Sequence, residues 1–338
     1  MISRRLIMGA GISLPLAACR PRTGGRLRVG VAFETLQTEY WVASFDIIRS
    51  ELEKNNIETL EAISDGDANR QLEQIKSFVA RRVDGVIVAP KDAHTVIPMI
   101  KAVNRRDIPI VIYNRPPAEN PYKRVTVGTD NFGITRNTVQ YLCQLARQTM
   151  PARAGKKHKA LILMGDLGDI NAIGRRDGFD AAVKENADIV EVVTRVPTEW
   201  NQEKALAGIT NGLQAHPDIS LVFTSSDFLL PSVVSALKNA GKFHPAGHPE
   251  HVLLGAFDGD SMAFRMLRDK TLDADGVQDA YAQSRLVVQS ILAMRAGEKV
   301  NPLVLDPGLV VHQENLKETT SRMWGAQLVL QSERANRG

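Results

Sequence analysis

Short apolar runs rich in β-branched residues alternate with longer amphipathic stretches along most of this chain. Such runs predict buried strands, and the 3.6-residue periodicity between them predicts helices that cover a sheet. In the first half the predicted strands are 27–32, 57–62, 83–89 and 108–113, and the predicted helices are 41–54, 68–81 and 95–105. This alternation is typical of a parallel sheet with helices on both faces.

The same plan repeats after Val125-Thr-Val-Gly-Thr-Asp-Asn131, which we interpret as a strand that crosses between two similar halves. The later predicted strands are 160–164, 189–193, 221–224, 252–256, 274–277 and 309–312. The later predicted helices are 132–147, 174–186, 202–216, 229–240, 261–269 and 281–296. The predicted fold class is therefore α/β, with two doubly wound parallel-sheet lobes joined by a three-strand hinge.

The repeat also predicts where each lobe begins and ends. We assign 27–129 plus 279–308 to the N-terminal lobe, 130–278 plus 309–317 to the C-terminal lobe, and strands near 127–130, 276–278 and 308–311 to the hinge. The tail, 318–338, lies outside the repeat, and its pattern predicts a helix over 318–334. Asp130 and Asn131 should then lie at the floor of a cleft between the lobes.

Polar and aromatic residues gather in the loops that follow the predicted strands. The first half offers Thr38 to Trp41, Asp65, Asp67, Asp92, Asn114 and Arg115, and the second offers Asp166 to Asn171, Thr198 to Trp200, Ser225 to Asp227, Asp258 to Asp260 and Gln278. Because ligands of open α/β sheets bind at the carboxyl ends of the strands, these loops should line one cleft. Rings that cover C–H faces and polar groups that bond hydroxyls suit a small polyhydroxylated ligand. Taken singly, each loop is equally consistent with simple turn formation.

The N-terminus has the features of an export signal. The pair Arg4-Arg5 precedes an apolar run over 6–18 that is too short to span a bilayer, and Cys19 follows small residues. The segment 1–18 resembles a bacterial lipoprotein signal, which implies a lipidated Cys19 and a linker over 19–26. An ordinary secretory signal and twin-arginine export stay open. We expect a periplasmic protein that meets the membrane only through a lipid anchor.

Composition and charge limit the remaining classes. Of the 338 residues 43% are hydrophobic, which is enough for a substantial core. The chain has 42 basic and 38 acidic residues, and removal of Arg4 and Arg5 leaves 40 basic residues against 38. This near balance argues against a nucleic-acid partner. Without Cys19, Cys143 is the single thiol, so the sequence predicts no intrachain disulfide and no thiol metal site.

Motifs of enzymes and cofactor sites are missing from the sequence. We find no Gly-x-Ser-x-Gly, no phosphate-binding glycine loop and no His-Glu-x-x-His, so we expect neither catalysis nor a cofactor. His244, His248 and His251 form one metal-like cluster in a loop rich in Pro and Gly. A solvated loop is the favoured interpretation of this cluster, and a metal site is the alternative.

Several motifs stand in an order that is specific to one family. They are Gln71-Leu-Glu-Gln-Ile75, Val83-Asp-Gly-Val-Ile-Val-Ala-Pro90, Ile108-Pro-Ile-Val111, Val127-Gly-Thr-Asp-Asn131, Arg176-Asp-Gly-Phe179, Ala215-His-Pro-Asp218 and Phe257-Asp-Gly259. Over about 26–314 the chain resembles the ribose-binding-type periplasmic solute-binding proteins of sugar transporters. The resemblance implies the type 1 fold of periplasmic binding proteins, a sugar or polyol ligand, closure about a hinge, an ABC permease as partner, and a monomer.

The resemblance also implies which residues bind the ligand. The ring-stacking pair falls on Tyr40 and Trp41 and the third aromatic wall on Trp200, while hydroxyl-binding positions fall on Asn114, Arg115, Ser226, Asp227, Asp258 and Gln278. Ile173 stands where the family usually has a ligand-binding Arg, with Asn171 and Arg175 nearby, and Thr38-Glu39 replaces a common Asn-Pro. We therefore expect a site with one guanidinium fewer than the family pattern, and we include Asn171 among its residues.

Proteins with two other functions share the fold that the resemblance implies. A sensory binding protein that reports to a kinase or chemoreceptor needs the same cleft, so it stays open as the alternative. A lactose-repressor-type regulator needs a DNA-binding headpiece of about 50 to 60 residues before the first strand. The 26 residues that precede it here resemble an export signal, which argues against a regulator.

Overall fold

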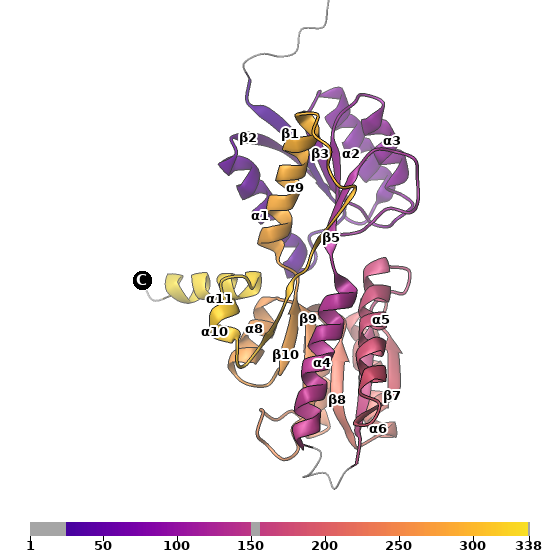
Figure 1. Ribbon diagram of the computed structural model, residues 1–338, viewed down its shortest axis with the longest axis vertical. Coiled ribbons are helices and arrows are strands. Elements are labelled where there is room, and N and C mark those ends of the chain that lie inside the picture. Colours follow the sequence, from indigo (N-terminus) through magenta and orange to yellow (C-terminus); the bar gives the residue numbers. More distant parts are fainter. Residues whose placement is uncertain (1–24, 150–155, 337–338) are drawn as a thin grey trace, which may run out of the picture.

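The computed structural model describes residues 25–149 and 156–336, which form two α/β lobes stacked end to end (Figure 1). Each lobe is built on a six-stranded sheet with helices on both faces. The prediction of two parallel-sheet lobes is confirmed, with one addition. The last strand of the second sheet runs antiparallel to its neighbour.

The N-terminal sheet has the strand order β11-β5-β4-β3-β1-β2 and is parallel throughout. Its strands are β1 (Leu27–Phe33), β2 (Ile57–Ile63), β3 (Gly85–Ala89), β4 (Ile110–Tyr113), β5 (Val125–Thr129) and β11 (Leu303–Asp306). Helices α1 (Glu39–Lys54) and α9 (Ala280–Arg295) cover one face, and α2 (Ala68–Ala80) and α3 (Ile97–Asn104) cover the other. Both faces of the central strands are therefore buried, which explains their continuous apolar runs.

The C-terminal sheet has the order β12-β10-β9-β8-β6-β7. Its strands are β6 (His158–Met164), β7 (Val190–Pro197), β8 (Ile219–Thr224), β9 (Leu253–Asp258), β10 (Ala274–Val277) and β12 (Leu309–His312). Helices α4 (Asn131–Thr149) and α5 (Ile170–Glu185) cover one face. Helices α6 (Gln202–Ala215), α7 (Leu230–Asn239) and α8 (Ser261–Arg268) cover the other, and the short helix η2 (Asp227–Leu229) precedes α7.

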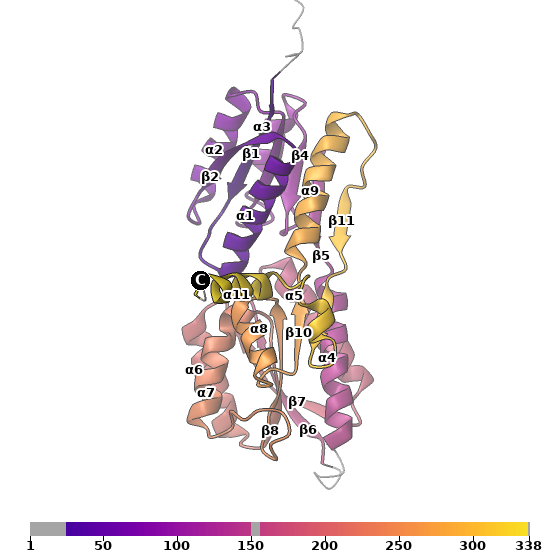
Figure 2. The same ribbon diagram turned by 90° about the vertical axis from the view of Figure 1, so that its left-hand side faces the viewer.

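Three segments of the chain cross between the lobes (Figures 1 and 2). They are β5 to α4, β10 to α9, and β11 to β12. Asp306, which is 1% exposed, links all three: its carbonyl accepts from Asp130 N at 3.0 Å, and its carboxylate accepts from Asp279 N at 2.9 Å and Gly308 N at 3.0 Å. One buried aspartate thus joins the three crossings, through its carbonyl and its carboxylate.

Two elements differ from the sequence prediction. Strand β11 was not predicted, because it is an edge strand whose Leu303 and Leu305 are each 46% exposed, so it lacks a buried run. The predicted tail helix is instead two helices, α10 (Leu316–Thr319) and α11 (Trp324–Ala335). The chain turns between them so that the side chain of Trp324, 1% exposed, becomes buried.

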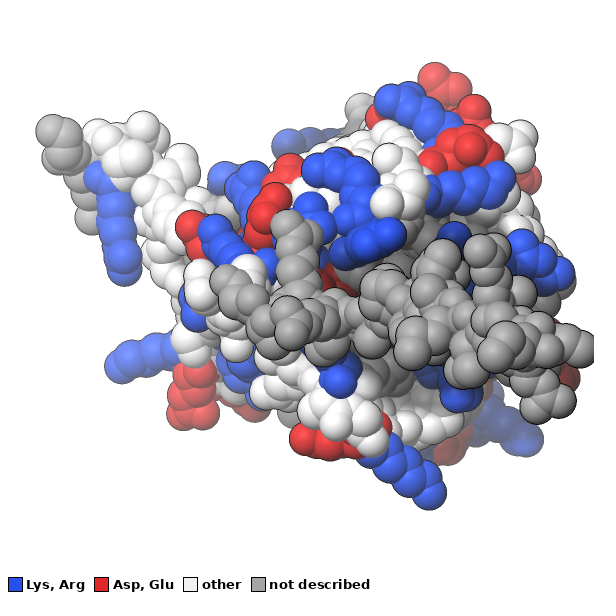
Figure 3. Space-filling model, turned by 90° about the horizontal axis from the view of Figure 1, so that it is seen from above, with Lys and Arg blue, Asp and Glu red and all other residues white. Residues whose placement is uncertain are grey.

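No helix among the described residues is long and apolar enough to cross a bilayer. The predicted signal segment and Cys19 lie outside the described residues. On the end of the molecule that Figure 3 shows, basic and acidic side chains are interspersed, in keeping with the near balance of charge.

Candidate functional site

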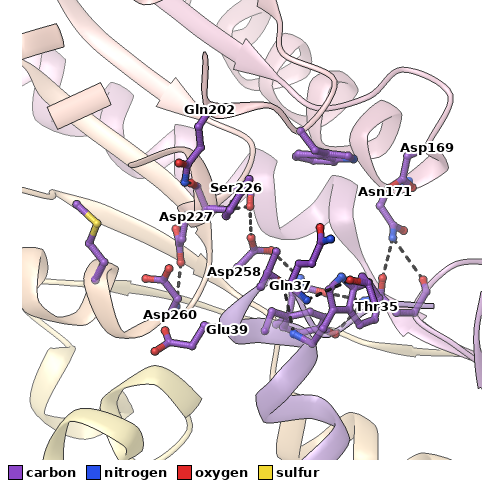
Figure 4. A pocket seen from close by; sticks show the side chains of 18 of the residues that line it. Thr35, Gln37, Glu39, Asp169, Asn171, Gln202, Ser226, Asp227, Asp258 and Asp260 are labelled. Atoms are coloured by element: carbon purple, nitrogen blue, oxygen red, sulfur yellow. Dashed lines mark hydrogen bonds between the residues drawn. The ribbon is translucent and has the colours of Figure 1, made fainter. Parts of the chain in front are cut away.

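A cavity of about 520 Å³ lies between the lobes. Helix α1 and the loop after β4 line it from the N-terminal lobe, and the loops after β6, β7, β8 and β9 line it from the C-terminal lobe. All ten residues that the sequence predicts for the site line this cavity: Tyr40, Trp41, Asn114, Arg115, Asn171, Trp200, Ser226, Asp227, Asp258 and Gln278. Figure 4 shows side chains from both lobes directed toward it.

Tyr40 and Trp41 are placed in the wall of the cavity by the start of α1. Thr38 caps this helix, since its hydroxyl accepts from Trp41 N at 3.4 Å. The guanidinium carbon of Arg115 lies 5.1 Å from the centre of the Trp41 ring. The hydroxyl of Tyr40 is held by Asn114 Nδ2 at 2.9 Å and by Tyr113 at 3.1 Å, so the ring has a fixed orientation.

Trp200 supplies the aromatic wall on the opposite lobe. It follows β7 in a left-handed backbone conformation, with φ of 57°. Its indole lies against Gly165, where an added Cβ would be 2.1 Å from the ring, so only glycine leaves room for it. The guanidinium carbon of Arg175 lies 5.8 Å from the centre of this ring. Each lobe thus presents an indole with an arginine nearby.

Six buried side chains, five of which line the cavity, are joined in a closed ring of hydrogen bonds. The members, in order around the ring, are Asn114, Gln278, Asp258, Arg175, Asn131 and Asn171. Asn114 comes from the N-terminal lobe, Gln278 and Asn131 from the crossings, and the other three from the C-terminal lobe. The ring therefore joins both lobes and the hinge.

The bonds of this ring leave few choices for side-chain orientation. Asn114 Nδ2 donates to Gln278 Oε1 at 3.0 Å, and Gln278 Nε2 donates to Asp258 Oδ1 at 2.7 Å. Asp258 Oδ1 also accepts from Arg175 Nη1 at 3.0 Å. On the other side Asn171 Nδ2 donates to Asn114 Oδ1 at 2.9 Å, across the lobes. Because each member is bonded to two others, the ring holds its side chains in fixed orientations.

Asn114 and Asp258 reach the cavity through unusual backbone conformations. Asn114 follows β4 with φ of 66°, and Asp258 ends β9 with φ of 143°. Such conformations are costly for residues other than glycine and persist where the surrounding structure imposes them. Of the nine described non-glycine residues with positive φ, three therefore line the cavity: Asn114, Trp200 and Asp258.

The expectation of a missing guanidinium is wrong. Arg175 is 4% exposed, lines the cavity, and donates to Asn131 Oδ1, the carbonyl of Ser225 and Asp258. The prediction failed because it began the helix at residue 174, whereas α5 begins at Ile170. With that start, residues 171 and 175 are one turn apart on the inner face, and Ile173 lies on another face. The i, i+4 spacing of Asn171 and Arg175 is the signal that could have identified Arg175.

Ser226 and Asp227 hold the loop that carries Asp258. Ser226 Oγ donates to Asp258 Oδ2 at 2.5 Å. Asp227 Oδ2 accepts from the backbone amides of Gly259 at 2.8 Å and Asp260 at 2.9 Å. Burial, followed by repulsion from Asp275, raises the pKa of Asp227 well above its usual value. This carboxyl therefore takes up a proton more readily than an exposed one.

Carboxylates outnumber cations around the cavity. Arg115 pairs with Glu34 at 2.6 Å and approaches Asp169 of the opposite lobe at 3.7 Å, and Arg175 pairs with Asp258. Among the described cavity residues, Glu39, Asp227 and Asp260 are further carboxyls, and burial raises the pKa of Asp260 to about 7.

Other loop residues that the sequence offered serve local structure. Asp67 caps α2, and Asp92 accepts from the amides of residues 94 and 95, so neither lines this cavity. Asp130 caps the first turn of α4, and Asn131 lies behind the cavity floor, where it bonds Arg175. For Asp67, Asp92 and Asp130 the structure supports the interpretation as turn and cap formers, whereas Asn131 belongs to the ring of side chains.

The histidine cluster also has a local explanation. The rings of His244 and His248 stack at 3.9 Å, and His251 bonds the carboxylate of Asp273 at 2.9 Å. Within the part of the chain that the structure describes, no group of three His, Cys, Asp or Glu residues is arranged to hold a metal.

Comparison with known proteins supplies the family. Residues 29–299 match the model of the family described as "Periplasmic binding protein domain". A D-ribose/D-allose-binding protein of Pseudomonas aeruginosa is 26% identical over 88% of this chain and 92% of its own length. A ribose import binding protein of Bacillus subtilis is 23% identical over 82% of this chain and 85% of its own.

A solved structure supports the same assignment. An ABC transporter solute-binding protein from Mycobacterium smegmatis with bound glycerol is 25% identical and superposes with a TM-score of 0.74, over 87% of this chain and 96% of that one. The chain therefore belongs to the periplasmic binding protein family, as a solute-binding protein and not an enzyme.

Proposed function

We propose that this protein captures a small sugar or polyol in the cavity between its lobes, closes around it, and delivers it to an ABC permease. The closed ring of side chains carries this proposal. It brings amide, carboxylate and guanidinium groups, drawn from both lobes, into the lining of one cavity that Trp41 and Trp200 also line. Such groups bond hydroxyls while the indoles cover C–H faces.

The size and polarity of the cavity agree with this ligand class. A volume of about 520 Å³ lies within the usual range for small-molecule sites. The relatives named above bind ribose or allose, and the Mycobacterium protein holds glycerol. A micromolar affinity requires about 8 kcal/mol, which ring contacts and several hydrogen bonds supply after the cost of closure.

Closure follows from ligand contacts to both lobes. A ligand that touches Asn114 on one lobe and Asp258 on the other stabilises the arrangement in which both are within reach. We further propose export, lipidation at Cys19 and action as a monomer, in line with the N-terminal sequence.

The test is a titration of the protein from residue 19 onward with pentoses, hexoses, polyols and inositols. Tryptophan emission and thermal unfolding are followed together, because Trp41 and Trp200 line the cavity and a bound ligand must raise the melting temperature. We expect at least one saturable ligand. An Asp258→Asn variant should lose it, while Asp269→Asn, on an exposed residue, should keep it. The proposal is contradicted if no compound in the panel changes the tryptophan emission or the melting temperature of the wild-type protein.

A further inference from the structure

The segment from Met323 to Val329 contacts both lobes, although it lies beyond the residues that match the family. Figure 2 shows α11 lying across the boundary between the lobes, beside α8. Trp324 belongs to the apolar cluster of the N-terminal lobe, together with Tyr40 and Trp41. Its neighbours Met323 and Val329 belong to the cluster of the C-terminal lobe.

The Trp324 side chain touches one cavity residue from each lobe. Its Nε1 donates to the carbonyl of Asp258 at 2.9 Å. Its ring meets the ring of Tyr40 at 5.9 Å between centres, with 64° between the planes. Asp258 is the residue with φ of 143°, and Tyr40 bonds Asn114 in the ring of side chains. Trp324 itself is 1% exposed and lies behind the cavity, not in its lining.

The segment is firmly attached to the loop after β9. Gly325 N donates to the carbonyl of Gly259 at 3.0 Å. An added Cβ on Gly325 would lie 2.1 Å from the carbonyl carbon of Asp260, so no side chain fits there. Arg322 Nε also donates to Asp279, in the second crossing, at 3.1 Å, but the backbone contacts of Trp324's own neighbour Gly325 are with the loop after β9. Trp324 therefore moves with the C-terminal lobe, and an opening of the lobes would separate it from Tyr40.

We infer that Trp324 is a positioning residue for the cavity: it holds the Asp258 backbone and the Tyr40 ring in place, and it joins the two lobes behind the bound ligand. The C-terminal segment thereby favours the closed arrangement and strengthens binding without touching the ligand. The effect on affinity rests on the proposed function, whereas the effect on the lobes does not require a ligand.

The first test measures the distance between the lobes in the absence of ligand. Spin labels are attached to cysteines introduced by Lys101→Cys on α3 and Lys184→Cys on α5, both at exposed positions. The labelled chain also carries Cys19→Ser. The remaining cysteine, Cys143, is 1% exposed and is therefore not labelled. We expect a short-distance population in the wild-type protein that is reduced severalfold in Trp324→Ala. Val329→Ala is the matched control, because Val329 is buried in the same helix but packs only in the C-terminal cluster. Equal distance distributions for wild type and Trp324→Ala would overturn the inference.

The second test measures affinity. Trp324→Phe keeps a buried ring but removes the bond to Asp258, so the dissociation constant should rise about three- to tenfold. The melting temperature should fall as well, because the Asp258 carbonyl loses one donor and the smaller ring leaves a gap. Val329→Ala should lower the melting temperature and leave the dissociation constant unchanged. Equal weakening in both variants would show a general packing effect and overturn the assignment. If the wild-type protein binds nothing in the panel, the proposed function fails, and the distance measurement still decides the role of Trp324.

Discussion

Arg175 is the residue on which the buried charge of the site depends. Its guanidinium is 4% exposed, lies 3.8 Å from the centre of the Phe257 ring, and bonds three buried oxygens. A charge in such a position is stable only while its partners remain, because burial restricts the water that could replace a lost partner. Removal of Arg175 would leave the carboxylate of Asp258 buried without a cation.

We expect Arg175→Ala to lower the free energy of unfolding by about 3 to 5 kcal/mol and to abolish binding. Urea unfolding and ligand titration measure the two effects. Arg176→Ala is the control, since Arg176 pairs with Asp177 at the helix surface and such pairs contribute about 0 to 1 kcal/mol. Similar losses of stability in the two variants would show that the buried Arg175–Asp258 pair contributes no more than the surface Arg176–Asp177 pair.

Asp227 and Asp275 form a second buried pair, with like charges. Asp275 is fully buried on β10, where its carboxyl interacts with that of Asp227. Burial, with repulsion from Asp260 and Asp258, raises the pKa of Asp275 well above its usual 3.8, and burial and Asp275 do the same for Asp227. Their protonated forms are therefore favoured by folding.

This pair predicts a loss of stability at high pH. A carboxyl whose pKa is raised by folding stabilises the protein below its unfolded pKa, and that contribution disappears as the pH rises through the folded value. The loss is about 1.4 kcal/mol per pH unit for each proton held only by the folded state. Asp275→Asn removes one charge, so its unfolding free energy should fall less between pH 5 and pH 9 than that of the wild type. The exposed Asp269→Asn should follow the wild-type profile, and an Asp275→Asn profile parallel to it would contradict the prediction.

At the scale of elements, the site depends on how closely α5 packs against α4. Gly178 of α5 lies where an added Cβ would be 2.4 Å from the carbonyl oxygen of Phe132 on α4. The same helix carries Asn171 and Arg175 into the cavity. Any displacement of α5 therefore moves two members of the ring of side chains.

Gly178→Ala should force the helices apart, lower the free energy of unfolding by about 1 to 3 kcal/mol, and weaken ligand binding. Asp177→Ala, on the adjacent exposed position, should change neither quantity appreciably. Chemical unfolding and calorimetric titration of both variants test this. Wild-type affinity in Gly178→Ala would show that α5 does not have to approach α4 so closely.

The period of the apolar pattern was enough to predict most elements, because both sheets are buried on both faces. The interval 274–277, for example, is a strand in both the prediction and the structure. The pattern failed where burial is one-sided or irregular, as in β11. It also could not place Trp324, since nothing in the spacing of a tail residue indicates that it packs between Tyr40 and Asp258.

The predicted cavity residues came from strand ends, where the topology itself brings side chains together. Asn114, Trp200, Asp258 and Gln278 all lie at or just after strands. Arg175 lies inside a helix, so its placement depended on the exact start of α5, and helix starts are the least certain part of a sequence pattern.

At the scale of the whole molecule, the third crossing packs tightly against the other two. Gly308, between β11 and β12, has φ of 55°. An added Cβ would lie 2.2 Å from Ile134 Cδ1 and 2.5 Å from the carbonyl oxygen of Val277. Because Val277 ends the strand that leads into the second crossing, a side chain at 308 would push two crossings apart.

Gly308→Ala should therefore change both the stability and the geometry of the hinge. Gly297→Ala is the matched control: Gly297 also has a left-handed backbone, with φ of 78°, but its added Cβ would meet no atom within 4 Å. Both variants lose about 1 to 2 kcal/mol from the left-handed conformation, and only Gly308→Ala loses a further 1 to 3 kcal/mol, roughly, from the collision. Spin-label distances between the lobes should shift in Gly308→Ala alone, because only its collision acts on the crossings. The prediction is contradicted if the two variants lose the same free energy of unfolding and their inter-lobe distances match the wild type. The crossings would then accommodate a side chain at 308 without a change in hinge geometry.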